Sequence, residues 1–154
     1  MAESADLAGD GATITKLSLV VYEGRFDRVH YALAMASAAA AIGRPVTLFF
    51  TMEACRALAA ADAAGQPGWA GLPVAAGEED AQTMNADYAA KGIGSFEELL
   101  EACVAFDATF MVCEMGLRAR GLDDMALRDD VPITKGGIVS FLNDAERHGA
   151  VVFI

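Results

Sequence analysis

Short apolar runs alternate with segments of helical periodicity along most of the chain. The β-rich run 16–22 predicts a first strand. From Phe26 to Ala40 the apolar residues recur at steps of three and four, which predicts a helix that stops at Gly43. The run 46–50 has no polar alternation beyond one threonine, and it therefore predicts a second strand that is covered on both faces.

The middle of the chain predicts less regular structure. The alanine-rich segment 53–64 has a helix-forming composition and predicts a second helix. Residues 65–77 are rich in glycine and proline and predict a long irregular excursion. Segment 78–94 is ambiguous, with one helical turn around Met84 and Tyr88 as its interpretation. Irregular segments of this length are usually functional or disordered, so a lid is one expected role.

Regular periodicity returns after residue 94. Ser95 and Glu98 have the spacing of a capping box, which predicts a helix whose buried stripe includes Cys103. The run 108–112 predicts a third strand, and Cys113 follows at its C-terminal end. The remaining expected elements are a short helix over 114–120, a short strand over 131–133, a helix over 138–145 and a closing strand over 150–154.

The order of these elements indicates the fold class. Alternating strands and helices predict an α/β fold with a mostly parallel sheet and helices on both of its faces. At 154 residues the chain fits one domain with a core of its own. We expect residues 16–154 to form that domain and residues 1–15, which are small and acidic, to form a flexible leader.

Charge narrows the choice of partner. The 22 acidic and 11 basic side chains give a formal net charge of -11 at pH 7. Such a charge repels phosphate backbones and anionic membrane surfaces, so a nucleic-acid partner is disfavoured. No apolar run approaches the length of a membrane span, and the start does not resemble an export signal. A cytoplasmic location is therefore expected.

Three cysteines, Cys55, Cys103 and Cys113, are the main candidates for chemistry. Their odd number and the absence of a CxxC pair disfavour a disulfide scaffold. Thiol chemistry or simple burial must therefore explain them. Cys103 lies in the middle of an apolar helical stripe, which favours a position in the core.

Cys113 and Cys55 fall at the edge of the sheet where α/β proteins bind ligands. The turns after the first three strands bring residues 22–25, 51–55 and 113–118 to the carboxyl ends of the strands. A thiol at the start of a helix is stabilised as a thiolate by free amides and the helix dipole. The alternative for Cys113 is a buried residue that ends a core strand, and for Cys55 a small residue that fills space in its helix.

Other chemical motifs are absent or incomplete. Gly92-Ile-Gly94 follows no strand and lacks a third glycine, so the dinucleotide fingerprint is missing. The chain has neither a phosphate-binding P-loop nor a serine nucleophile elbow, and no cofactor is expected. A soft-metal site of Met52, Cys55, Cys113 and Met115 is an alternative, although this spacing fits no compact ligand motif.

Segment 113–121 has the sequence Cys-Glu-Met-Gly-Leu-Arg-Ala-Arg-Gly. It resembles the cysteine segment of the DsrE/DsrF/DsrH-like proteins. In that family a strand-terminal cysteine opens a short helix that runs to an Arg-Gly pair. The resemblance covers Lys16 to Ile154 and is to the branch often labelled peroxiredoxin-like. Further matches lie at Phe49-Phe50-Thr51, 85–94, Gly136-Gly137, Phe141-Leu142 and 152–154. It implies a three-layer α/β/α sandwich with a largely parallel five-stranded sheet, and assembly into trimers or hexamers.

The resemblance makes a sulfur relay the leading hypothesis. In it, Cys113 accepts sulfane sulfur from a donor protein or a small sulfane-sulfur compound and passes it on as a persulfide. Cys55 is the only candidate for an internal resolving thiol, so the acceptor is expected to be a partner protein. Two alternatives stay open: a non-enzymatic module that binds a small ligand or soft metal at the same edge, and a structural subunit of an oligomer.

Overall fold

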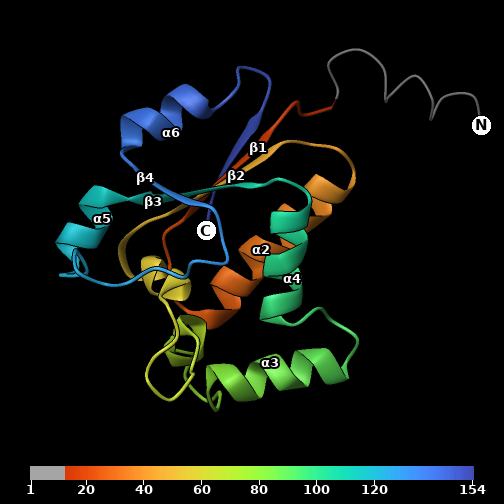
Figure 1. Cartoon of the computed structure of the whole chain (residues 1–154). Helices are drawn as coiled ribbons and strands as arrows, with labels where there is room; N and C mark the ends of the chain where they lie inside the picture. Colours follow the sequence, from red (N-terminus) through yellow and green to blue (C-terminus); the bar gives the residue numbers. More distant parts are fainter. Residues whose placement is uncertain (1–12) are drawn as a thin grey trace, which may run out of the picture.

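Five parallel strands form the centre of the computed structural model, which describes residues 13–154 (Figure 1). Their order in the sheet is β4-β3-β2-β1-β5, and every neighbouring pair is parallel. The strands are β1 (Leu17–Val21), β2 (Val46–Phe50), β3 (Thr109–Cys113), β4 (Ile133–Gly136) and β5 (Ala150–Phe153). The predicted parallel α/β sheet is confirmed, and the closing strand β5 lies at one edge.

Helices lie on both faces of this sheet, which gives the expected three layers (Figure 1). α2 and α4 pack against each other on one face, and α6 lies across the other face (Figure 1). None of the helices in residues 13–154 is long and apolar enough to cross a membrane. The helices are α2 (Phe26–Ala41), η1 (Met52–Leu58), η2 (Gly68–Gly71), α3 (Ala81–Ala90), α4 (Phe96–Ala105), α5 (Glu114–Ala119) and α6 (Ile138–Asp144).

The two faces of the sheet contribute to two separate apolar clusters. The larger cluster lies under α2 and α4 and takes up one alternating set of strand residues, including the fully buried Leu19, Leu48 and Phe110. The smaller cluster lies under α6 and consists of Phe49, Met111, Cys113 and Phe141. All five residues of β2 are buried, so its predicted coverage on both faces is confirmed. The layer over Cys113 is the thinner of the two.

The helix predicted over 53–64 is wrong. The structure has a 3₁₀ helix there, η1, which ends at Leu58, and Ala59 is already extended. The cause is close packing by the following excursion, because a Cβ atom at Gly68 would lie 2.3 Å from the carbonyl oxygen of Arg56. Ala59 also forms an isolated antiparallel bridge with Leu127. Tertiary packing therefore overrides the helix propensity of the alanines.

Two further expectations need correction, and one is untested. Segment 78–94 contains a helix of three turns, α3, in place of one turn, and Asp80 caps it by accepting a hydrogen bond of 2.7 Å from the amide of Thr83. The short strand expected over 131–133 is β4, which begins at Ile133 and continues to Gly136. The leader expected over 1–15 lies mainly outside the described residues.

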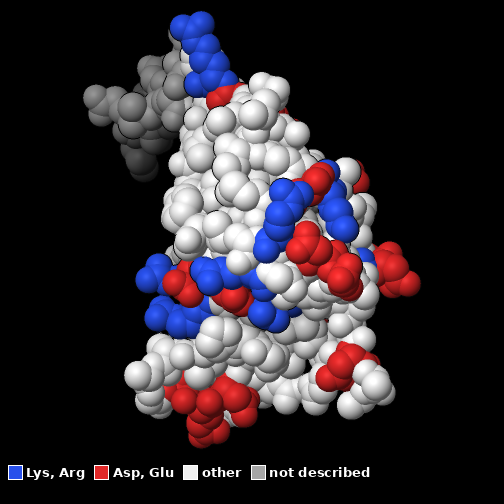
Figure 2. Space-filling model, turned by 90° about the vertical axis from the view of Figure 1, so that its left-hand side faces the viewer, with Lys and Arg blue, Asp and Glu red and all other residues white. Residues whose placement is uncertain are grey.

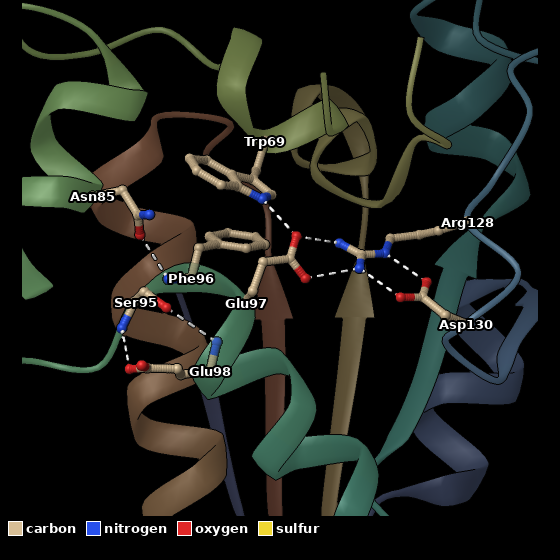
Figure 3. A network of polar contacts seen from close by, with 8 residues as sticks. All are labelled: Trp69, Asn85, Ser95, Phe96, Glu97, Glu98, Arg128 and Asp130. Atoms are coloured by element: carbon tan, nitrogen blue, oxygen red, sulfur yellow. Dashed lines mark hydrogen bonds and ion pairs between the residues drawn. The ribbon is translucent and has the colours of Figure 1, made fainter. Parts of the chain in front are cut away.

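A polar network fastens the long excursion to α4 (Figure 3). The indole Nε1 of Trp69 donates to Glu97 at 2.8 Å. Arg128 donates two hydrogen bonds to the same carboxylate, at 2.9 and 2.8 Å, and two to Asp130, at 2.8 and 2.7 Å. The Arg128 guanidinium holds the pKa of Glu97 below its usual value by hydrogen bonding, against the opposing effect of burial. Two segments, the excursion that holds Trp69 and the loop that holds Arg128 and Asp130, therefore converge on the start of α4.

The start of α4 is also capped as the sequence predicts. Ser95 accepts from the Glu98 amide at 3.3 Å, and the Glu98 carboxylate accepts from the Ser95 amide at 3.0 Å, which confirms the capping box. The side chain of Asn85 in α3 accepts from the Phe96 amide at 2.7 Å (Figure 3). Trp69 stacks on Phe96 with ring centroids 5.2 Å apart. Segment 65–94 is thus anchored beside α2 and α4, on the face opposite α6, and does not form a lid over Cys113.

Candidate functional site

The turns after β1, β2 and β3 meet at one end of the sheet, as the parallel order predicts. A Cβ atom at Gly24 would lie 2.7 Å from the Cβ of Glu53, which joins the first turn to the second. A Cβ at Gly116 would lie 2.4 Å from the Oγ1 of Thr51, which joins the second turn to the third. Both glycines are therefore required by close approach, and the three turns form one packed unit.

Cys113 lies at the centre of this unit. It is the last residue of β3 and the N-cap of α5, and its Sγ accepts a hydrogen bond of 3.3 Å from the amide of Gly116. Its side chain is 0% exposed. The following residue, Glu114, is exposed to solvent, because neighbouring positions at a helix start point about 100° apart. Its carboxylate therefore points away from the thiol.

Cys55 is the second thiol close to this position. It lies in η1, it is 0% exposed, and its Sγ donates to the carbonyl of Phe50 at 3.6 Å. Burial, together with a smaller contribution from the nearby Cys113, raises the pKa of Cys55 to about 12. Cys55 is therefore a protonated thiol at neutral pH. The structure brings it into electrostatic contact with Cys113.

Cys103 is separate from this pair. It lies in α4, fully buried in the larger cluster, and its Sγ donates to the carbonyl of Leu33 in α2 at 3.7 Å. Burial raises the pKa of Cys103 to about 12. The predicted core position of Cys103 is confirmed.

An apolar groove of about 340 Å³ adjoins the Cys113 cluster on the α6 face of the sheet. Phe49 and Phe141 stack at 4.8 Å between their ring centroids and pack on Cys113. Met115, the second residue of α5, is 48% exposed at the margin of the groove. The groove lining is almost free of polar groups and consists of Val20, Tyr22, Phe49, Thr51, Met52, Met115, Ile138, Phe141, Leu142, Val151 and Phe153.

Several of these residues have no signal in the sequence that marks them as part of a site. Phe141 is predicted as a core position of the last helix and Phe153 as part of the closing strand, and both lie in segments that match the resembled family, but neither is predicted to line a site. Both become neighbours of the Cys113 segment because β5 returns beside β1 and α6 crosses the sheet. Met52, at the start of η1, has a φ of 53°, a conformation that is uncommon outside glycine and tends to occur at functional sites.

The chemistry available here is that of a shielded thiol. Within residues 13–154 the Cys113 sulfur forms one hydrogen bond, which it accepts from the Gly116 amide, and the other members of its cluster, Phe49, Met111 and Phe141, are apolar. Residues 13–154 contain no cluster of three or more His, Cys, Asp or Glu side chains that could hold a metal ion. The soft-metal alternative would therefore depend on thioether sulfur from Met52 and Met115.

Comparison with known proteins agrees with the geometry of the fold. The model of the DsrE/DsrF-like family matches residues 19–148. No curated protein matches the chain significantly. Among solved structures, the YchN protein of E. coli superposes with a TM-score of 0.53 at 15% sequence identity, covering 92% of this chain and 100% of that one. At this identity the likeness concerns the fold alone.

Proposed function

The chain belongs to the DsrE/DsrF-like family, and on that basis we propose that it is a sulfur-relay protein that carries sulfane sulfur on Cys113. One contact supports this assignment above the others: the Gly116 amide donates to the Cys113 Sγ at 3.3 Å. An amide in this position stabilises a thiolate before transfer and a persulfide after it. Cys55 and Cys103 instead act as donors, to the carbonyl groups of Phe50 and Leu33.

The proposed reaction consists of two exchange steps without net oxidation. The Cys113 thiolate attacks the outer sulfur of a donor persulfide, so a new S–S bond forms while the donor S–S bond breaks. The donor leaves with the electron pair as a thiolate and takes up the proton that Cys113 has released. An acceptor thiolate then attacks the outer sulfur of the Cys113 persulfide, and Cys113 leaves as the thiolate that Gly116 stabilises.

The acceptor thiol in this proposal belongs to a partner protein. Cys55 is the only second thiol near Cys113, but its raised pKa of about 12 leaves little thiolate at neutral pH. Cys55 would therefore act as an internal resolving thiol only after a change in its surroundings. We assign Cys113 the role of carrier and Cys55 that of a secondary site residue.

We also propose a cellular location and an oligomeric state for the protein. Three free cysteines are compatible with the reducing cytoplasm, where we place the protein, with residues 16–154 acting as one domain. The net charge of -11 argues against nucleic acid as a partner. Val151 and Phe153 are 56% and 67% exposed, and such apolar surface supports a homo-oligomer, which we propose to be a trimer or a hexamer.

Intact mass after treatment with polysulfide tests the relay directly. We expect the wild-type protein to gain the mass of one sulfur atom, which dithiothreitol removes. Cys55→Ala should keep the adduct, Cys103→Ala serves as the matched control for a buried cysteine, and Cys113→Ala should lose it. An adduct that persists in Cys113→Ala would contradict the proposal. A wild-type protein that takes up no sulfur but co-purifies with a small molecule would favour the ligand-binding alternative.

A further inference from the structure

The outer edge of β5 carries backbone groups without a partner in residues 13–154. The inner edge is fully used: Ala150 donates to the carbonyl of Lys16 at 2.9 Å, and Ile154 donates to that of Val20 at 2.8 Å. Because backbone groups alternate in direction along a strand, the N–H and C=O of Val151 and Phe153 point outward. No strand within the described residues pairs with them.

This edge also lacks the features that normally prevent edge-to-edge pairing. Edge strands are usually protected by a lysine, a proline, a bulge or an inward charge, and the sequence Ala-Val-Val-Phe of β5 has none of these. Val151 is 56% exposed and Phe153 is 67% exposed, both on the α6 face. An apolar, regular and unpaired edge is a surface that another strand can extend.

Grooves flank β5 on both faces of the sheet. On the α6 face, Val151 and Phe153 line the apolar groove of about 340 Å³ beside the Cys113 cluster. On the α2 face, Val152 and Ile154 line a larger groove of about 700 Å³, together with Tyr31, which is 65% exposed, and the charged Arg25, Asp27 and Arg28. A broad uncharged area occupies the upper part of the surface that carries α5 and α6 (Figure 2). A second polypeptide chain placed along the outer edge of β5 would cover both grooves at once.

We propose that a second copy of this chain covers this edge, with the two β5 strands paired antiparallel about a twofold axis at Val152. In this register Val151 lies opposite Phe153 of the second copy, and all four outward backbone groups of each strand gain partners. Val152 lies opposite Val152 of the second copy. These two residues form no hydrogen bonds with each other, because the N–H and C=O of Val152 point inward, toward β1. The two sheets then form one continuous sheet. Such a twofold contact occurs in a hexamer built from two trimers and not in a trimer alone, so of the two assemblies proposed above it selects the hexamer.

Charge supports an antiparallel copy as the occupant. The exposed Arg147 precedes β5, and the exposed Glu23 lies at its other end, where its amide donates to the carbonyl of Ile154. Antiparallel pairing brings Arg147 of each copy toward Glu23 of the other, so opposite charges meet at both ends. The same pairing places Phe153 of the second copy beside the groove that adjoins Cys113. This contact is independent of the sulfur chemistry proposed above.

Engineered cysteines test the register. In an antiparallel pair without hydrogen bonds the two Cα atoms are about 4.5 Å apart, which a disulfide can span. Val152→Cys should therefore form a covalent dimer under mild oxidation. Val151→Cys is the register control, since residues 151 of the two copies lie diagonally across the strand pair, about 7–8 Å apart, which is too far for a disulfide. Val139→Cys, exposed on α6 outside both grooves, controls for random collision, and the buried native cysteines give little background.

A second measurement covers the case in which Val152→Cys folds poorly. Val151→Lys changes only an exposed side chain and should weaken the twofold association by about tenfold or more in analytical ultracentrifugation, because it places like charges at the axis. Val139→Lys should leave this association unchanged. The proposal is overturned if the wild-type protein is a monomer or a trimer at micromolar concentration, if Val151→Lys has no effect, or if Val151→Cys cross-links as readily as Val152→Cys. Sulfur uptake on Cys113 is measured separately and can succeed or fail on its own.

Discussion

Replacing Arg128 with methionine should destabilise the protein more than any other single change of a basic residue. Arg128 is 13% exposed at its side chain and links Glu97 in α4 to Asp130 through two bidentate contacts of 2.7–2.9 Å (Figure 3). Methionine keeps much of the side-chain volume but removes every donor. Glu97 would then keep only the indole of Trp69 as a partner.

The size of the effect follows from how buried the partners are. A hydrogen bond to a charged group contributes about 1.5–3 kcal/mol, and breaking a fully buried ion pair costs about 3–5 kcal/mol. Glu97 and Asp130 are 37% and 60% exposed at their side chains, so water would replace part of the lost interaction. We therefore expect a loss of about 2–3 kcal/mol in the free energy of unfolding. For a chain of this size that lowers Tm by about 4–10 °C.

Urea unfolding at two pH values tests this reasoning. The pKa of Glu97 is lowered in the folded state, so its stabilising effect is present above the pKa of the unfolded chain and is lost as pH falls through the lower, folded value. The difference in the free energy of unfolding between wild type and Arg128→Met should therefore be largest at pH 7 and become smaller in acid. Arg118→Met is the control, since Arg118 is 76% exposed and 4.0 Å from Asp123. Equal stability of Arg128→Met and wild type at pH 7 would refute the argument.

Three further predictions concern the cysteines and their turn. Gly116→Ala should destabilise the fold by about 1–3 kcal/mol in urea unfolding, because the new methyl group meets the Oγ1 of Thr51; Gly137→Ala, which has open space, is its control. Cys103→Ser should cost about 1–3 kcal/mol by the same measurement, since it buries a hydroxyl in an apolar cluster; an unchanged midpoint would contradict this. Phe141→Leu should increase the alkylation rate of Cys113 but leave that of Cys103 unchanged, and equal acceleration of both thiols would indicate global unfolding instead.

The sequence predicts this fold well wherever packing agrees with local preference. The strand 46–50, the helix from Phe26 and the capping box at Ser95 all have patterns that their surroundings reinforce, and all three are found. The segment 53–64 fails because Gly68 packs onto the carbonyl of Arg56, a contact between residues that no periodicity reveals. α3 is predicted only as a single turn for the opposite reason: Ala81 is its one fully buried residue, so its apolar pattern is limited to the half-buried Met84 and Tyr88.

The site is predictable in part for a similar reason. Position at the end of a strand identifies Cys113 and the turns beside it, because the rule for parallel sheets depends only on element order. Burial does not follow from that rule. The complete burial of Cys113 depends on Phe49 and Phe141, which come from a different strand and from the last helix. The sequence leaves the choice between a reactive and a buried cysteine open, and in the structure Cys113 has both the burial and the amide contact.

The difference between the two faces of the sheet reconciles the burial of Cys113 with the sulfur exchange proposed for it. Cys103 lies under α2 and α4, where exposing it would open the main core, including the fully buried Leu33 and Leu100 at 0% and 1% exposure. Cys113 lies under α6, a helix of seven residues of which Phe141 is the only buried one. The free energy of a local opening scales with the apolar contacts that it breaks, so displacing α6 costs far less than unfolding the domain. A thiol on the thin face can therefore be shielded from solvent for most of the time and still reach a partner, whereas one on the thick face cannot.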